Sequence, residues 1–541
     1  MNKIWGPVCW ADIACVALML VLLWVPDINC VTALSYTQDK FLHMDLFAAG
    51  AGLGYAHGLT PSLDSNANYG ALIPAIFASI SKWMGGVNYN NFFTITMVGG
   101  ILYFIGCYVF LRVWFKNIPL AILGVFTALH VQMFHAGVAP LIWRFPSATE
   151  VRYFFDLAFL YFLWRHTQSH KSRDIGWAAA VCGLMLACVF EVGVYLTLSL
   201  GVYLAALWVT PQCRNIRRVG SWVMASAIIP VVAAVVMMLF LKGAIFQSAF
   251  WTNNTEFTRF FLAYYGAMPM TESLSNGHWL AFTCGFLPVV IYALTAMVVG
   301  ALVFLGMIHW RHLFVVALCV YGLGIYHYYV FRSAITSYCV VAVPAVLVCC
   351  FWLKIVVERY WAVMSNKILW PLAVGAIVVL FFNPLFRDYP NVLNLSHRPW
   401  QDTIAEYRQH TDVSEDAKLI SSLTGPQDRV ALVSSLDVKI LMEAKRAPFF
   451  YYTPLVYPRP FETLDFGGTE IFTTTRLKRI LGSLQTASPE YVFVEKKLFL
   501  GMLPAVYYTH YETLTILMRY LSEHYMPDKS GKYLLALKRK I

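Results

Sequence analysis

The chain has 541 residues, of which 59% are hydrophobic and 13% are charged, and its formal net charge is +11. Roughly a quarter of the residues in soluble domains are charged, so this composition excludes an ordinary soluble protein and predicts a polytopic membrane protein. The positive charge does not indicate a nucleic-acid partner, because the Lys and Arg residues sit mostly in short clusters between apolar runs, as topology determinants do. The twelve cysteines all lie at or before Cys350 without zinc-site spacing, so neither redox chemistry nor a structural metal is indicated.

The sequence divides into two parts. Residues 1–386 are largely apolar and predict a transmembrane domain, whereas residues 387–541 are polar and contain no membrane segment. A spanning helix needs about 20 apolar residues, and Lys and Arg are enriched on the cytoplasmic side. Eleven predicted crossings put the N-terminus in the cytoplasm and the polar tail outside a membrane that we expect to be a bacterial inner membrane. The expected spans are 10–31, 92–115, 118–135, 151–165, 176–190, 193–210, 220–241, 282–306, 313–330, 334–353 and 368–386.

Two of these spans, 176–190 and 193–210, are short for a bilayer. The segments before and after this pair of spans are both basic and are therefore placed in the cytoplasm. The chain is thus expected to cross outward and return at once, with Gly193 near the turn. Glu191 then lies at or just below the outer surface. An ionisable residue there is costly unless it faces protein or a water-filled cavity. Glu191 is therefore either a solvated turn residue or a residue that faces a cavity.

The first external loop, residues 32–91, is the longest of three outer segments, the others being 136–150 and 242–278. Asp45 precedes a stretch of small and apolar residues with helical spacing, and a turn rich in Pro, Asp and Asn follows. An amphipathic run then extends from Ala71 to Trp83. This pattern predicts two helices in the membrane interface, joined by a turn.

This loop resembles the first external loop of the GT-C superfamily, the integral-membrane glycosyltransferases that use polyprenyl-phosphate sugars. The family includes protein O-mannosyltransferases and the bacterial lipid A aminoarabinose transferase. The resemblance makes Asp45 the catalytic acid, and it continues at residues 146–153 and in the polar tail. The positions that match the turn and the second helix are Gly58, Pro61, Asp64, Tyr69 and Pro74.

One departure from the family pattern affects the catalytic position. Many relatives have paired acids there, whereas Met44 precedes Asp45 in this chain. The base is therefore open between Asp45, Asp64 and Glu150. Because the acid pair is missing, we also expect catalysis to need no metal and no other cofactor.

Transfer from a lipid phosphate to a hydroxyl needs a base for the acceptor proton and a cation for the leaving phosphate. Guanidinium groups match phosphate oxygens by bidentate hydrogen bonds. Positive residues on the outer side run against the orientation rule, and these are Arg144, Arg152, Arg259 and Arg332. Together with them, we expect Asp64, Tyr69, Glu150 and Glu191 to contact substrate.

Structural roles compete with these functional ones. Asp45 is also suited to cap a helix that starts at Leu46, because Asp is a favoured N-cap residue. Asp64 fits a turn. Arg152 is close in sequence to two acids with which it can pair, Glu150 and Asp156.

The resemblance implies an inverting glycosyltransferase that moves a sugar from a polyprenyl-phosphate donor to an acceptor hydroxyl at the outer membrane surface. The acceptor class is a glycan, a lipid or a protein, and membrane lipid is a further partner. A flippase or transporter of a lipid-linked sugar is the main alternative, although it needs neither a long structured first loop nor a folded outer domain. An enzyme of the O-antigen-ligase type is a third possibility.

The tail, residues 387–541, alternates short β-rich runs with helical ones and predicts a small α/β domain. Its expected strands are 430–433, 449–456, 491–494 and 533–537, and its expected helices are 438–445, 475–484 and 512–524. It contains no phosphate loop, nucleophile motif or metal spacing. We therefore expect an accessory domain that covers the cavity and helps to choose the acceptor.

Overall fold

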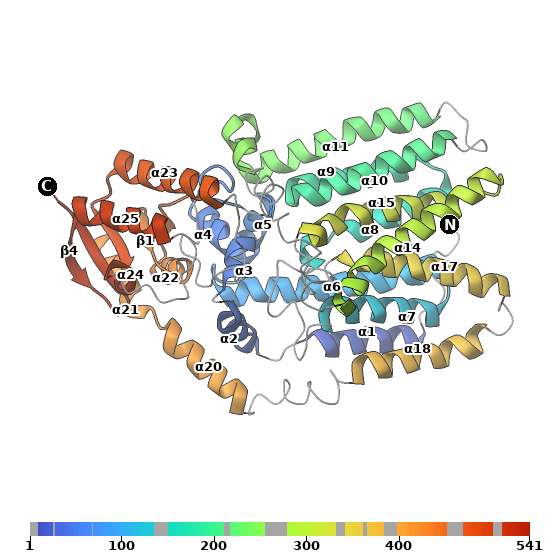
Figure 1. Cartoon of the computed structure of the whole chain (residues 1–541), viewed down its shortest axis with the longest axis horizontal. Helices are drawn as coiled ribbons and strands as arrows, with labels where there is room; N and C mark the ends of the chain where they lie inside the picture. Colours follow the sequence, from blue (N-terminus) through green and yellow to red (C-terminus); the bar gives the residue numbers. More distant parts are fainter. Residues whose placement is uncertain are drawn as a thin grey trace. The chain divides into compact units, whose positions relative to one another are not determined.

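A computed structural model describes most of the chain, and it divides into two compact units (Figure 1). The first, called here the helical unit, comprises 1–26, 96–236 and 268–395. The second, called the α/β unit, comprises 27–95, 237–267 and 396–541. The residues described are 9–24, 27–39, 41–67, 69–134, 150–209, 217–254, 279–331, 341–360, 365–382, 398–451, 469–500 and 511–540.

Every regular element among the described residues of the helical unit is a helix. Helix α6 begins in the α/β unit and continues into this one, and α11 ends in the α/β unit. The helices are α1 (Trp10–Leu23), α6 (Tyr89–Phe115), α7 (Ile118–Leu129), η2 (His130–Phe134), η5 (Glu150–Arg152), α8 (Asp156–Ser169), α9 (Ser172–Cys188), α10 (Phe190–Val209), α11 (Arg217–Leu241), α14 (Trp279–Phe304), α15 (Trp310–Phe331), α17 (Val343–Tyr360) and α18 (Ser365–Phe382).

Four helices among the described residues are long and apolar enough to cross a membrane. They are Tyr89–Phe115, Phe190–Trp208, Val219–Leu241 and Phe286–Phe304, and α1 with α2 (Ile28–Asp39) adds a fifth if this pair forms one broken span. The eleven predicted crossings are therefore not confirmed. Several of the others correspond to shorter helices, such as α8 with 14 residues and α9 with 17.

The predicted outward and return pair corresponds to α9 and α10, which pack side by side (Figure 1). The break lies at Val189, whose backbone is extended (φ −137°, ψ 96°), rather than at Gly193. Gly193 lies inside α10, and a Cβ atom there would collide with the backbone of Leu186 in α9. The missing side chain at this position therefore permits the close approach of the two helices just after their turn.

We expect Gly193→Ala to destabilise the protein by about 1–3 kcal/mol, the usual cost of overpacking, because the new methyl group meets backbone that cannot move aside. Gly201→Ala is the matched control on the same helix, since nothing lies within 4 Å of the Cβ position there. Thermal unfolding in detergent measures both. Equal unfolding midpoints for the two variants would contradict the packing of α9 on α10.

The first external loop forms part of the α/β unit and has the helix, turn and helix order that the sequence predicts. Its helices are α2, α3 (Leu42–Met44), η1 (Asp45–Ala49), α4 (Gly50–Ala56) and α5 (Leu72–Trp83). Helix α4 ends at Ala56, and Gly58, two residues further on, has φ +91°. The N–H groups of Gly58 and Leu59 donate to the carbonyls of Tyr55 and Gly54. This is the Schellman arrangement, which favours glycine at the left-handed position.

The C-terminal segment contributes a five-stranded sheet with the order β2-β1-β3-β5-β4. β1 pairs in parallel with β2 and β3, and β5 pairs antiparallel with β3 and β4. The strands are β1 (Arg429–Val433), β2 (Ala447–Pro448), β3 (Tyr491–Glu495), β4 (Tyr525–Ser530) and β5 (Leu534–Arg539). The helices are α20 (Arg398–Thr411), α21 (Ser414–Leu423), α22 (Asp437–Ala444), α23 (Thr469–Ala487), α24 (Lys496–Phe499) and α25 (Tyr511–His524).

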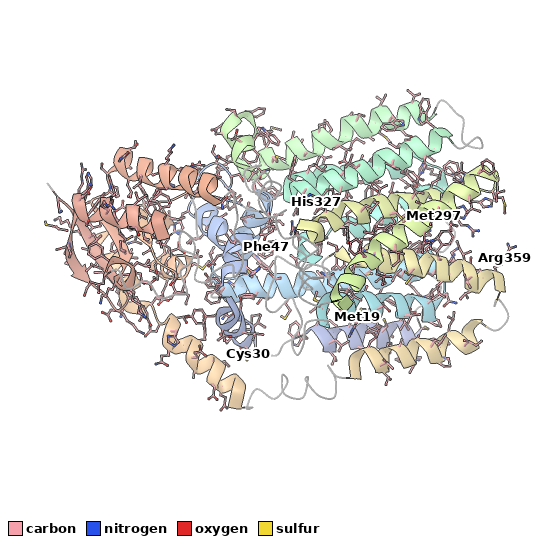
Figure 2. All side chains as sticks on the ribbon, in the orientation of Figure 1. Met19, Cys30, Phe47, Met297, His327 and Arg359 are labelled. Atoms are coloured by element: carbon pink, nitrogen blue, oxygen red, sulfur yellow. The ribbon has the colours of Figure 1, made fainter. Side chains whose placement is uncertain are left out.

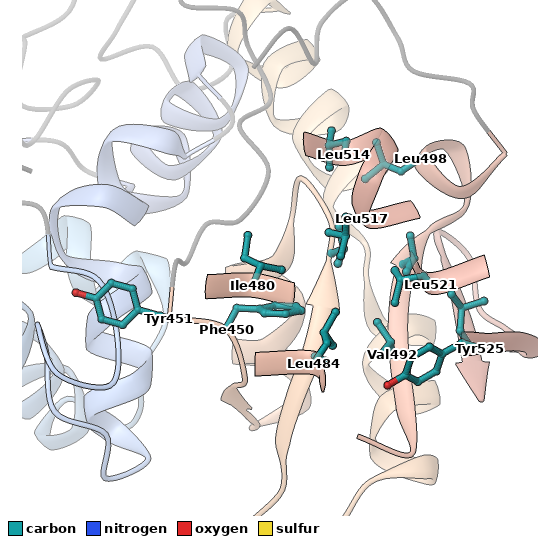
Figure 3. Packing of buried hydrophobic residues seen from close by; sticks show 14 residues of the cluster. Phe450, Tyr451, Ile480, Leu484, Val492, Leu498, Leu514, Leu517, Leu521 and Tyr525 are labelled. Carbon is teal, nitrogen blue, oxygen red and sulfur yellow. The ribbon is translucent and has the colours of Figure 1, made fainter. Parts of the chain in front are cut away.

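An apolar cluster between these helices and the sheet forms the core of the segment (Figure 3). Ile480 and Leu484 of α23 and Leu517 and Leu521 of α25 are buried in the same cluster as Val492 of β3. The apolar residues of each helix recur three or four positions apart, which gives each helix one face for the sheet. α20 packs instead on α2 of the first loop.

The predicted tail elements agree with the structure in most places. The expected strands 430–433, 491–494 and 533–537 correspond to β1, β3 and β5, and each expected helix overlaps an observed one. The strand expected at 449–456 is wrong at its start, because β2 covers only Ala447–Pro448, and residues 452–456 lie outside the described residues. β4 was not predicted, since it is a polar edge strand that contains Pro527.

Candidate functional site

Asp45 is a buried carboxylate whose side chain is fixed by a tyrosine. The residue is 6% exposed, and the Tyr89 hydroxyl donates to its Oδ1 at 2.6 Å. Phe41, at φ +69°, stacks on the Tyr89 ring with centroids 3.9 Å apart. Both contacts hold the phenol over the carboxylate, which matters because a buried charge is costly without a hydrogen-bond partner.

The capping role considered for Asp45 is wrong. The residue does not precede a helix, because its N–H already donates to the Phe41 carbonyl at 2.8 Å and helical structure starts at Leu42. Asp45 is instead the first residue of the π-helical turn η1, with no capping bond from its preceding residue. Wide helical turns of this kind are frequent at functional sites.

Tyr69 belongs to an aromatic cluster below this turn. Its ring packs edge-to-face on Phe47 at 5.9 Å, and Phe47 in turn packs on Phe77 of α5 at 5.6 Å. Phe47 is labelled in Figure 2. Tyr69 is 7% exposed, so these contacts make it part of the packing that supports η1.

Asp64 lies in the turn between α4 and α5. Its Oδ2 accepts the Thr60 N–H at 2.8 Å, and its own N–H donates to the Thr60 carbonyl. This is the turn role that the sequence left open. Asp64 also borders a pocket with residues of the C-terminal segment.

In the helical unit, Arg152 forms an ion pair with Glu191. The side chain of Arg152 is 3% exposed and that of Glu191 is 26% exposed, so the pair is largely removed from water. Glu191 therefore faces protein and is not a solvated turn residue. Two of the residues expected to contact substrate lie together here, although the sequence separates them widely.

Arg152 has an ionic partner that its neighbours in the sequence did not indicate. It pairs with Glu191 on α10. Asp156 accepts hydrogen bonds from Tyr321 at 2.7 Å and Tyr103 at 3.4 Å. The side chain of Glu150 lies outside what the structure describes.

Two residues near this ion pair were missed by the sequence analysis. Tyr195 lies four positions after Glu191, on the same face of α10, and its hydroxyl is 3.1 Å from Nδ1 of His327. His327 lies on α15 and is labelled in Figure 2. The spacing of four between Glu191 and Tyr195 was the available signal for a shared polar face.

The remaining cationic candidates cannot be placed. Arg144, Arg259 and Arg332 all lie outside the described residues. Within the part of the chain that is described, no group of three or more His, Cys, Asp or Glu residues is arranged to hold a metal ion.

Basic side chains do gather at the C-terminal end of α4. Lys82 and Lys242 donate to the carbonyls of Ala56 and Gly58, each at 3.2 Å. Burial lowers the pKa of the neighbouring His57, and the positive charges of Lys82 and Arg446 lower it further. Cations are favourable at the negative end of a helix, so this group fits a structural cap.

No family model and no curated protein matches the sequence. The fold is similar to several solved structures. The oligosaccharyltransferase AglB from Archaeoglobus fulgidus, in complex with an inhibitory peptide and a dolichol-phosphate, has a TM-score of 0.48 and 11% identity, covering 97% of this chain and 74% of that one. ArnT from Cupriavidus metallidurans bound to undecaprenyl phosphate has a TM-score of 0.45 and 14% identity, covering 97% of each chain.

At identities of 11% and 14%, the similarity concerns the arrangement of the chain. The function is therefore argued below from the residues of this protein.

We expect Arg152→Gln and Glu191→Gln each to destabilise the protein, because each leaves a largely buried charge without its ionic partner. The double variant is expected to lose less than the sum of the two, with a coupling energy of about 0.5–3 kcal/mol. Thermal unfolding in detergent of wild type, the two single variants and the double variant measures this coupling energy as a double-mutant cycle. Losses that add within about 0.5 kcal/mol would contradict a direct pairing of these charges.

Proposed function

We propose that this protein is a glycosyltransferase of the GT-C type that moves a sugar from a polyprenyl-phosphate donor to an acceptor hydroxyl. The observation that carries the proposal is the carboxylate of Asp45, buried in the first external loop and held by Tyr89. A general base must be oriented toward the proton that it takes, and the hydrogen bond from Tyr89 fixes the orientation of the Asp45 carboxylate.

The proposed reaction is a single displacement. The acceptor oxygen forms a bond to the anomeric carbon of the sugar while the bond from that carbon to the phosphate oxygen breaks. The acceptor proton passes to Asp45, and the polyprenyl phosphate leaves with the electron pair of the broken bond. Attack from the face opposite the phosphate inverts the anomeric centre.

A cationic group stabilises the phosphate as it leaves. Arg144, Arg152, Arg259 and Arg332 remain the proposed sources of this charge. Arg152 is supported by its position, because Glu191 holds this guanidinium in a largely buried place. Tyr195 and His327 offer further hydrogen-bonding groups beside it on α10 and α15.

The proposed localisation is an inner membrane of bacterial type, with the N-terminus in the cytoplasm and the C-terminal domain outside. In this arrangement 1–386 forms the transmembrane glycosyltransferase domain, and 387–541 acts as an accessory domain. The presence of 27–95 and 396–541 in the same compact unit supports a shared, extracytoplasmic location for both.

Transfer of labelled sugar in proteoliposomes, from a panel of polyprenyl-phosphate sugars, tests the proposal. We expect Asp45→Asn to reduce transfer by about 100-fold or more, the low end of what loss of a general base costs. Tyr89→Phe removes the hydrogen bond that orients the base and is expected to reduce transfer by about tenfold. Transfer that survives Asp45→Asn would move the base to Asp64 or Glu150. Sugar-lipid that crosses the bilayer without transfer would make the protein a transporter.

We expect transfer to continue in an excess of a divalent-cation chelator. A single carboxylate stands at the catalytic position, and its Oδ1 accepts a hydrogen bond from Tyr89. Divalent cations usually take several oxygen ligands, so this arrangement is more typical of a base than of a metal site. The rate is measured with and without chelator. Loss of transfer that added Mg²⁺ or Mn²⁺ restores would overturn this expectation.

A further inference from the structure

The α/β unit contains an open pocket of about 920 Å³. It lies between the N-terminal ends of β1 and β3, α23 and the turn of the first external loop, which contributes Leu63 and Asp64. Small-molecule sites range from about 300 to 1,000 Å³, so this pocket has room for a ligand of more than one ring.

The lining of the pocket is polar and of mixed charge. It includes three carboxylates, Asp64, Asp428 and Glu490, and two guanidinium groups, Arg429 and Arg479. Hydroxyl and amide side chains add groups that both donate and accept hydrogen bonds. Because neither sign of charge dominates, the pocket suits a ligand with many groups that donate and accept hydrogen bonds.

The charged groups are held in place by the protein. Nε and Nη2 of Arg429 donate to the carbonyls of Pro448 and Phe449 at 3.2 and 3.1 Å. Oδ2 of Asp428 accepts the Gly425 N–H at 2.6 Å. The guanidinium of Arg479 lies 3.5 Å from the centroid of the Tyr451 ring. Fixed polar groups lose little entropy when a ligand binds.

An aromatic wall completes the lining. Tyr491 and Phe449 are half-buried, so part of each ring remains accessible in the pocket. Aromatic rings offer an apolar surface beside polar groups. The C–H face of a pyranose ring is suited to such a surface, and its hydroxyl groups are suited to the planar side chains around it.

We propose that this pocket binds sugar rings of the acceptor, so that the acceptor is a carbohydrate or a glycolipid. This inference rests on the proposed function, since the acceptor is defined by the transfer reaction. The pocket is then the part of the α/β unit that selects the acceptor, while Asp45 activates its hydroxyl.

A peptide acceptor fits the pocket less well. Extended peptides bind most readily along an unpaired strand. Here β1 pairs with both β2 and β3, and β3 pairs with both β1 and β5. The strands that line the pocket therefore have no free backbone edge on which an extended peptide could pair.

The test uses the full-length protein in lipid nanodiscs and a pool of fluorescently labelled oligosaccharides released from a bacterial cell envelope. Thr486→Arg places a long side chain in the pocket from an exposed position of α23. Gln485→Arg is the matched control, because Gln485 is the exposed neighbour and does not line the pocket. We expect wild type and Gln485→Arg to retain the same oligosaccharides and Thr486→Arg to retain them at least about tenfold less.

Gln427→Ala, which removes an exposed side chain from the lining, provides a second variant in case Thr486→Arg does not fold. Retention no greater than that of empty nanodiscs overturns the proposal, and so does equal retention by wild type and the pocket variants. Pocket-dependent retention of a labelled peptide pool, in place of the glycans, also overturns it. Binding is measured without transfer, so a failure of the proposed enzyme activity is distinguishable from a failure of this site.

Discussion

The hydrogen bond from Tyr89 to Asp45 joins the two ends of the first external loop. Asp45 is the first residue of η1 and Tyr89 lies at the start of α6, so a single 2.6 Å contact links positions 44 residues apart. The aromatic residues between them pack into one cluster below the carboxylate. A buried carboxylate without this donor would lose a hydrogen bond to a charged group, worth about 1.5–3 kcal/mol. The loop therefore depends on the same contact that directs the proposed base.

A second buried charge imposes a similar constraint on the helical unit. Arg152 and Glu191 come from different helical segments, and each makes the burial of the other tolerable. Buried ion pairs contribute little net stability, but the loss of one partner is costly. The pair consequently fixes the position of η5 against α10 more than it strengthens the fold. Gly193 lies within the first turn of α10 and keeps the same helix close to α9.

The sequence predicted elements that depend on local patterns. The helix, turn and helix order of the first loop followed from Gly58 and its neighbours, and most strands and helices of the C-terminal segment followed from the period of their apolar residues. Side-chain partners across helices were not predictable in the same way. Whether Arg152 meets Glu191 or a nearer acid depends on how far each helix is rotated about its axis, which tertiary packing decides. The same holds for Tyr89 as the partner of Asp45.

The α/β unit gathers three separated stretches of the chain, 27–95, 237–267 and 396–541. A compact unit on one side of a bilayer requires that the chain return to that side between each stretch and the next. In the proposed arrangement, residues 96–236 and 268–395 therefore each cross the membrane an even number of times. The predicted spans number six in the first interval and four in the second, which satisfies this parity. Any revision of the topology within these intervals must then add or remove crossings in pairs.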